Sequence, residues 1–150
     1  MSLQPLPLEE AGCPLGRFST SFGAPAVPGI VLIYSADRSR AGVGETLTFT
    51  AWVLNSRNEK LTDVCLTLRS LTNSRLVPLH YATQPPTAAM THRDIAPFRS
   101  LTWTFTYAID SEDVTHPGVL ISSIQAGLVS PTQGKLHGEC DAIVAMEIAP

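Results

Sequence analysis

Residues 44–71, GETLTFTAWVLNSRNEKLTDVCLTLRSL, decide the fold class of this 150-residue chain. In the first half of the stretch, threonines at every second position alternate with apolar residues, and residues 64–69 repeat that alternation. A period of two places one face of a strand in a core and the other face toward water. The polar segment 55–60 separates the two halves. The stretch therefore predicts two strands joined as a hairpin.

Similar stretches lie on both sides of this pair. They occupy residues 30–34, 76–81, 101–108, 119–128 and 140–148. The segment 101–108 has the clearest alternation, whereas Pro78 marks the segment 76–81 as an edge strand. Seven such strands with turn-rich connections, and no long amphipathic helical window, predict an all-β, antiparallel two-sheet sandwich. The long connection 83–97 is expected to be a functional loop or a contact surface.

The first 28 residues differ in composition from the remainder, and we expect an extended arm at 1–28 and the sandwich domain at 29–150. The arm contains five of the twelve prolines, which cannot donate ladder hydrogen bonds. It is nevertheless too apolar for a solvated linker. Two interpretations remain: the arm docks on another protein, or it folds back over its own sandwich. The side chains proposed for docking are Leu3, Leu6, Leu8, Phe18 and Phe22.

Composition argues against several classes of function. The net charge of −3 and the pI near 5.7 argue against a nucleic-acid partner, because phosphate binding requires a basic surface. No apolar run approaches the roughly 20 residues that span a bilayer, so no membrane insertion is expected. Residues 1–12 lack the basic and apolar regions of a signal peptide. Cys13, Cys65 and Cys140 have no disulfide-framework spacing and are expected to be thiols.

No sequence motif indicates a reaction, a cofactor or a metal site. The chain has no nucleophile elbow, phosphate-binding loop or zinc-type cysteine and histidine spacing. The four histidines lie in or beside expected loops, and His92 with Asp94 is interpreted as part of a turn. The acidic run 110–113 lacks the spacing of a calcium loop and is expected to be a solvated turn. The sequence therefore predicts no catalytic residues, no metal ligands and no cofactor.

Trp52 and Leu54 are the most informative side chains, because they share the polar face of the first strand in 44–71 with its threonines. A large aromatic residue on such a face is covered by another segment or is exposed as a contact anchor. Tryptophan is enriched at binding hot spots. A β-bulge that turns Trp52 inward is a third alternative.

Three quoted segments carry a family resemblance: VGETLTFTAWVLNSRNEKLTDVCLTL at 43–68, IAPFRSLTWTFTYAI at 95–109 and GVLISSIQA at 118–126. In this order they resemble the Ig-like "conserved repeat" domain of bacterial surface proteins over roughly residues 28–148. The resemblance implies an Ig-like sandwich that serves as a non-catalytic spacer or binding module. The chain departs from the family in being single, in lacking a signal peptide and in having Ser-Ser-Ile at 122–124.

The functional expectation is a non-enzymatic structural or interaction module that docks on a larger protein assembly. A virion decoration or capsid-surface protein is one example, and a homo-oligomer is a further form of assembly. The alternative is a secreted or cell-wall-attached adhesion module that binds glycans. An enzyme ranks third, because no nucleophile, base and oxyanion donors cluster in the sequence.

Overall fold

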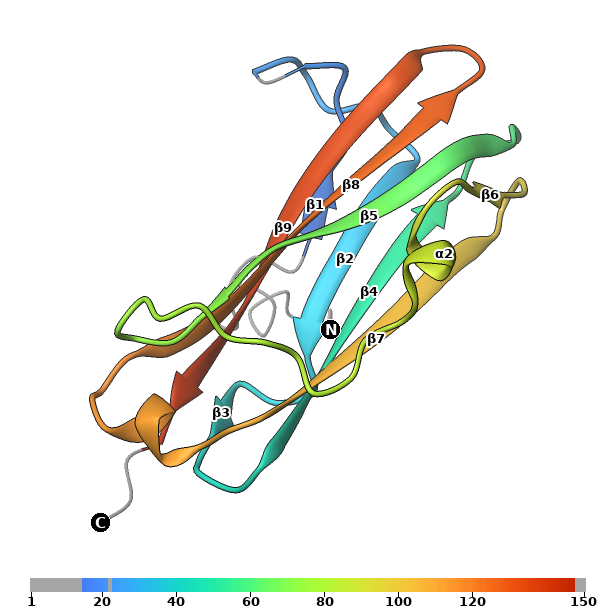
Figure 1. Ribbon diagram of the computed structural model, residues 1–150. Coiled ribbons are helices and arrows are strands. Elements are labelled where there is room, and N and C mark those ends of the chain that lie inside the picture. Colours follow the sequence, from blue (N-terminus) through green and yellow to red (C-terminus); the bar gives the residue numbers. More distant parts are fainter. Residues whose placement is uncertain (1–14, 22, 148–150) are drawn as a thin grey trace, which may run out of the picture.

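Two β-sheets packed face to face form the protein, as the computed structural model shows (Figure 1). The model describes residues 15–21 and 23–147. The first sheet has the order β1 (Leu15–Arg17), β2 (Ile30–Ala36), β4 (Thr46–Asn55) and β7 (Ser100–Ala108). The second has the order β3 (Arg40–Ala41), β9 (Gly134–Met146), β8 (Val119–Ser130), β5 (Leu61–Thr72) and β6 (Arg93–Ile95). The predicted all-β sandwich is thus confirmed, with nine strands in the described residues.

The order of the long strands is that of an immunoglobulin-type sandwich. The neighbours β2, β4 and β7 correspond to strands A, B and E, and β9, β8 and β5 correspond to G, F and C. The expected hairpin of residues 44–71 is wrong, because β4 and β5 belong to opposite sheets. The turn between them carries the chain across the sandwich. The last residue of β4, the buried Asn55, donates hydrogen bonds from Nδ2 to the carbonyls of Glu59 and Ala96.

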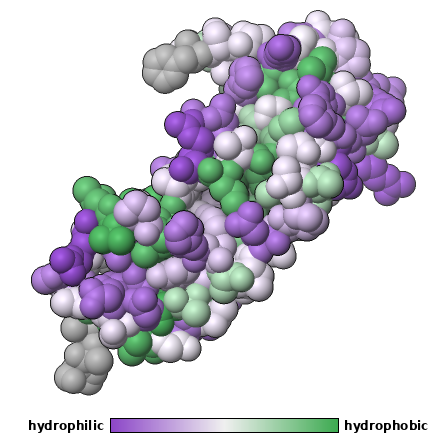
Figure 2. Space-filling view, viewed as in Figure 1, coloured by the Kyte–Doolittle hydropathy of each residue, from purple (hydrophilic) through white to green (hydrophobic). Residues whose placement is uncertain are grey.

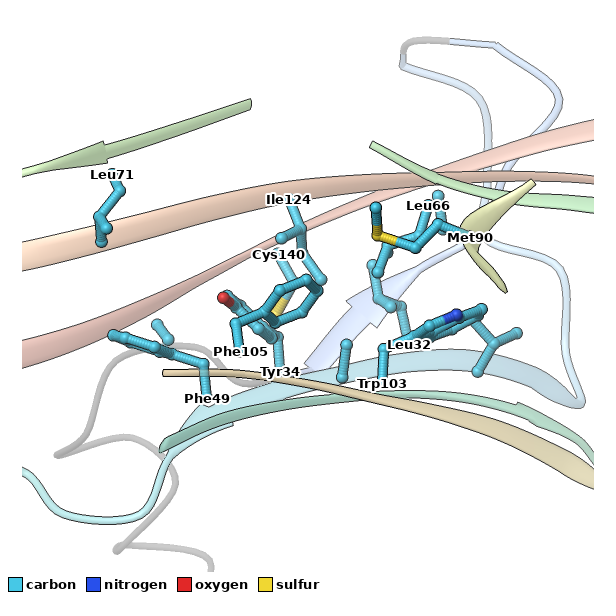
Figure 3. Packing of buried hydrophobic residues seen from close by; sticks show 14 of the residues in the cluster. Leu32, Tyr34, Phe49, Leu66, Leu71, Met90, Trp103, Phe105, Ile124 and Cys140 are labelled. Carbon is cyan, nitrogen blue, oxygen red and sulfur yellow. The ribbon is translucent and has the colours of Figure 1, made fainter. Parts of the chain in front are cut away.

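The core fills the space between the sheets with side chains from alternate positions. On the first sheet, β4 and β7 pair in register, with Phe49 opposite Phe105. Figure 3 shows apolar side chains of the two sheets pointing toward one another. Those labelled on the long strands are Leu32, Tyr34, Phe49, Trp103 and Phe105 from one sheet and Leu66, Leu71, Ile124 and Cys140 from the other. Each fully buried Leu or Phe contributes about 1.5–3 kcal/mol, so this alternation holds the sheets together.

The described part of the N-terminal segment belongs to the sandwich. Strand β1 pairs with β2, and Phe18 has no exposed surface within the core. Ser19 and His137 then exchange two backbone hydrogen bonds of 2.9 Å, which tie the segment to β9 of the other sheet. The domain boundary expected at residue 28 is therefore misplaced, and Phe18 is not a docking side chain. Residues 15–19 close one side of the sandwich by contacting both sheets.

The connection between β5 and β7 differs from its prediction. Residues 76–81 do not form the expected strand; Pro78 makes a single β-bridge with Thr72. Proline lacks the N–H that a ladder requires, and Leu76 has a left-handed φ of 62°, which interrupts an extended chain. The loop expected at 83–97 contains the short helix α2 (Thr87–Met90) and β6. Among the described residues, no helix is long and apolar enough to cross a membrane.

Cys65 and Cys140, the two cysteines in the part of the chain that the structure describes, are predicted to remain thiols. Cys65 on β5 is half-buried on the outer face, whereas Cys140 on β9 is buried in the core. The strand β8 lies between them, and Cys140 is three residues along β9 from His137, which is in line with Cys65, so their Cα atoms are separated by more than the roughly 9–10 Å of two strand spacings. A disulfide requires less than about 7 Å. Alkylation in denaturant without reductant should modify both residues, and a mass-spectrometric Cys65–Cys140 cross-linked peptide would contradict the topology.

Candidate interaction surface

The outer face of the first sheet carries an apolar strip in the middle of a polar surface. Val31 on β2 lies opposite Leu54 on β4, and Ile33 lies opposite Trp52. These four side chains, called the apolar strip below, are all half-buried. The remaining outward positions of β4 and β7 are mainly hydroxyl side chains: Thr46, Thr48, Thr50, Ser100, Thr102, Thr104 and Thr106. The strip therefore has a border of groups that can form hydrogen bonds with water or with a partner.

Trp52 and Leu54 occupy the face predicted for them. The β4–β7 register runs without interruption from Thr46 to Leu54, so the alternative of a bulge at Trp52 is wrong. Trp52 has Ile33 on one side and the exposed Thr102 on the other. The exposed Arg17 on β1 lies opposite Val31, so one cation lies at the edge of the strip. An aromatic ring with a polar N–H, flanked by aliphatic side chains and a polar rim, is typical of a contact anchor.

An exposed phenylalanine extends the apolar surface beyond the end of β4. Phe98 is 65% exposed and has a left-handed φ of 62° in the turn between β6 and β7. Together with Leu54, Ser56 and Arg99 it lines a shallow hollow of about 350 Å³. A non-glycine residue held at positive φ costs of order 1–3 kcal/mol, and such conformations cluster at functional sites. The sequence analysis did not single out Phe98, because no strand alternation marks the side chain of a residue in a turn as part of a surface patch.

A second surface feature is the groove beside the open edge of β5. Strand β6 covers only the beginning of β5, and a hollow of about 450 Å³ lies between residues 68–72 of β5 and residues 78–84. The loop after β5 carries the exposed side chains of Leu76 and Val77. Figure 2 shows hydrophobic side chains grouped at the left end of the molecule, where this loop lies. Only the part of this edge before Leu71 offers a place where an extended peptide can add to the sheet, because the Leu79 N–H donates to the Leu71 carbonyl and Pro78 forms a bridge with Thr72.

Buried tyrosine and serine hydroxyls form hydrogen bonds with one another within the fold. In the core, the Ser122 hydroxyl is hydrogen-bonded to the phenols of Tyr34 and Tyr81. Burial raises the pKa of Tyr34 and of Tyr81, so both phenols remain protonated at neutral pH. These hydroxyls connect the two sheets, and at neutral pH neither phenol serves as a base.

The acidic run 110–113 differs from the expected solvated turn at one residue, Asp113. Asp113 has no exposed surface, and its carboxylate accepts hydrogen bonds from Tyr107 Oη at 2.6 Å and Asn73 Nδ2 at 3.0 Å. It also accepts the N–H of Asp110, whose own side chain caps the 3₁₀ helix η1 (Ser111–Val114). Asp113 is a buried structural anchor, whereas Asp110, Ser111 and Glu112 are exposed. Asp113 is held in place by Tyr107 and Asn73. These two residues are distant from one another in sequence, so no local pattern indicated that they bind the same carboxylate.

The structure also brings together three metal-type ligands that sequence reasoning separated. Asp63 and Cys65 on β5 meet His92, which follows α2. The ligand atoms of these residues lie within 4.8 Å of one another. His92 was interpreted as a turn residue, and it does have a left-handed φ of 53°. The Asp-x-Cys spacing on one strand was the only signal available in the sequence.

Of the seven side chains predicted to interact, two lie on the apolar strip and one lies in the core. Trp52 and Leu54 are at the surface as expected, whereas Phe18 is buried. The other four lie outside the described residues: Leu3, Leu6, Leu8 and Phe22. Val31 and Ile33 join the surface through register, and the continuous apolar run at 30–34 was their signal in the sequence.

No protein-family model matches the chain, and neither does any curated protein. The GAE domain of yeast GGA1 is similar in structure, with 13% identity, a TM-score of 0.43, and coverage of 82% of this chain and 95% of that domain. A family 123 glycoside hydrolase from Clostridium perfringens has 11% identity and a TM-score of 0.45. The match covers 73% of this chain and only 22% of the hydrolase. A CARDB domain from Pyrococcus furiosus, in complex with di-metal ions, has 10% identity, a TM-score of 0.36, and coverage of 86% and 98%. These similarities assign neither a family nor an activity.

Proposed function

We propose that the protein is a non-catalytic interaction module that docks on a larger protein assembly through the apolar strip. The observation that carries this proposal is the pairing of Val31 with Leu54 and of Ile33 with Trp52 on an outer sheet face that is otherwise rich in threonine. A monomeric protein gains nothing in solubility from an apolar group placed there. A partner that covers the strip removes its apolar area from water, which is the main favourable term in association.

The side chains of this surface indicate which chemical groups a partner should present to it. Trp52 and Phe98 offer two aromatic anchors, and aromatic side chains dominate the energetics of interfaces. Threonine hydroxyls form most of the rim, with Arg17 at one edge and Arg99 beside Phe98. The complementary surface is therefore apolar at its centre and weakly polar at its edge. A virion or other capsid-type surface fits this description, and it is the assembly that we propose.

A glycan-binding adhesion module is the second candidate, and the exposed Phe98 beside the Leu54 hollow is the observation that favours it. Sugar rings stack on aromatic faces, and Trp52 and Phe98 both belong to this part of the surface. However, the side chains between the aromatic residues are aliphatic, and a glycan requires convergent hydrogen-bonding groups there. The apolar strip thus supports a protein partner better than a sugar.

Site-specific photo-crosslinking tests the docking proposal. A photoreactive residue at Thr102, the exposed neighbour of Trp52, leaves the strip itself intact. After irradiation with particles or extract of the source organism, we expect a covalent product with a protein of the assembly. Trp52→Ser should abolish this product, because the substitution removes the central aromatic anchor. The product and the crosslinked residue are identified by mass spectrometry.

The matched control carries the photoreactive residue at Thr67, which is exposed on the outer face of the opposite sheet. It should give no product with the same protein. Crosslinks from position 102 only to residues 1–14 of the same chain would show that the chain covers its own strip, and the docking proposal would then fail. Equal products from positions 102 and 67, products confined to a second copy of this chain, or no product at all would also count against it.

A further inference from the structure

The group formed by Asp63, Cys65 and His92 lies on the outer face of the second sheet and is independent of the apolar strip. The β5–β8 pairing shifts register between Thr62 and Cys65, which is a β-bulge. Asp63 lies within this shift and has a left-handed φ of 53°. Bulges re-aim side chains, and they are over-represented next to functional sites. The loop after α2 then brings His92, 27 residues further along the chain than Cys65, over the same point of the strand.

We propose that Asp63, Cys65 and His92 bind a divalent transition-metal ion of the zinc type. The carboxylate, thiolate and imidazole are the three ligand types that zinc uses in proteins. Their ligand atoms lie within 4.8 Å of one another, and His92 Nδ1 is 2.5 Å from Asp63 Oδ1. Around a tetrahedral zinc ion such atoms are about 3.3–3.8 Å apart. The side chains of His92 and Asp63 are 80% and 52% exposed, which leaves them room to rotate toward that spacing.

Charge and proton balance favour a divalent ion over the bare cluster. Without metal, one proton lies between His92 Nδ1 and Asp63 Oδ1, and another is bound to the Cys65 sulfur when it is a thiol. When the ion binds, the Cys65 proton passes to the solvent, and the neutral His92 imidazole carries its proton on Nε2 in place of Nδ1, so that Nδ1 becomes a ligand atom without net proton release. The resulting site contains a carboxylate, a thiolate and a neutral imidazole around a +2 ion and is neutral. Metal binding that displaces a proton in this way becomes tighter as pH rises.

The surroundings of the sulfur fit a bound thiolate. The backbone N–H of His92 points to Cys65 Sγ, with 3.5 Å between nitrogen and sulfur. Hydrogen bonds to coordinating atoms hold the ligands of a metal in place. Asp63 and Cys65 also line a hollow of about 190 Å³, whose opposite wall includes His137 and Lys135 of β9. Zinc sites with three protein ligands hold a water at the fourth position, and this hollow beside Asp63 and Cys65 is a space for it.

His137 serves as a matched control within the same hollow. It lies opposite Gly127 on β8, which itself lies opposite Cys65 on β5, so the three residues form one row across the sheet. Gly127 has no side chain, and the His137 imidazole lies near the place where a Cβ would be. His137 does not belong to the group of ligand atoms within 4.8 Å. Its replacement by glutamine should therefore leave metal affinity unchanged.

Cobalt(II) is the probe for the experiment, because a cobalt–thiolate bond gives a charge-transfer absorption in the near ultraviolet. In a Cys13→Ser background, we expect one cobalt ion per chain, with that absorption and with displacement by zinc, which binds such sites more tightly. Cys65→Ser should abolish the absorption, and His92→Gln and Asp63→Asn should each weaken affinity by more than about tenfold. Circular dichroism and the melting temperature establish that each variant is folded.

The result that overturns the proposal is the absence of a cobalt–thiolate absorption in the folded protein, or its persistence in Cys65→Ser. The same conclusion follows if His137→Gln weakens binding as much as His92→Gln, because the ligand set would then be different. Zinc titrations in buffers of different ionisation enthalpy supply a second measurement. The proposal requires proton release on binding to the parent protein and a loss of that release in Cys65→Ser.

Discussion

Replacing Phe18 with alanine is expected to lower the free energy of unfolding by about 3–5 kcal/mol, the usual cost of removing a buried phenylalanine. Phe18 has no exposed surface, and its carbonyl accepts the N–H of Val27 at 2.8 Å. The ring lies where the N-terminal segment contacts both sheets, so its loss leaves a cavity at that junction. Domains of this size are stable by about 5–15 kcal/mol, and a large fraction of that would be lost. Urea denaturation followed by tryptophan fluorescence measures the change.

The matched control is Phe98→Ala, which removes the same side chain from a 65% exposed position. Substitutions at exposed sites usually change stability by less than about 0.5 kcal/mol. A second variant, Gly16→Val, tests the same junction without a cavity, because a Cβ at Gly16 would lie 2.4 Å from the carbonyl oxygen of Glu139. It should destabilise the protein strongly. If Phe18→Ala and Phe98→Ala have equally small effects, residues 15–19 are not part of the core.

The sequence predicts well which side of a single strand faces the core, because the alternation of apolar and polar residues along that strand shows it. The alternation in β7 correctly places Trp103, Phe105 and Tyr107 inward. The same alternation says nothing about which sheet a strand joins, so β4 and β5 were expected to pair although they lie in opposite sheets. Which strands pair depends on the connections between them and on packing across the core. Neither of these produces a periodic pattern in the sequence of one strand.

A group of surface side chains could be predicted from the sequence only where all of its members lie on one strand. Trp52 and Leu54 were found because they interrupt a row of threonines on β4. Val31 and Ile33 on β2 could be placed beside Trp52 and Leu54 only from the pairing register of the two strands. The cluster around Cys65 could be recognised only from the return of the loop after α2 to β5. Phe18 was misassigned for the same reason, since neighbouring prolines and glycines indicate an extended chain but not the surface on which it packs. Contacts between distant segments are the part of a site that composition does not encode.

Alkaline pH is expected to unfold the protein in one step that exposes all three of its tyrosines. Tyr34, Tyr81 and Tyr107 are the complete set in the chain, and burial raises the pKa of each above its usual value of 10. For Tyr107 the hydrogen bond to the Asp113 carboxylate raises the pKa further, because ionisation would place two anions together.

The sign of the effect follows from proton uptake in the two states. Above about pH 10 the unfolded chain releases phenolic protons that the folded protein retains. The stability that these groups contribute is fully present below pH 10 and declines as pH rises, by up to about 1.4 kcal/mol per pH unit for each tyrosine. The folded protein should therefore show almost no phenolate absorbance at pH 10. The absorbance should then rise together with the loss of near-ultraviolet circular dichroism.

Tyr34→Phe separates this linkage from general charge repulsion at high pH. The variant loses the hydrogen bond to Ser122 at 2.6 Å but keeps the ring that stacks on Phe49, so it should remain folded at neutral pH. Because one titrating group is gone, its free energy of unfolding should fall less steeply with pH above 10 than that of the parent protein. Lysine and cysteine ionisation is the same in both proteins and does not alter the difference. Equal slopes in the two proteins, or a phenolate titration near pH 10 with the fold intact, would show that these hydroxyls are accessible to water and that the tyrosines do not tie the two sheets together.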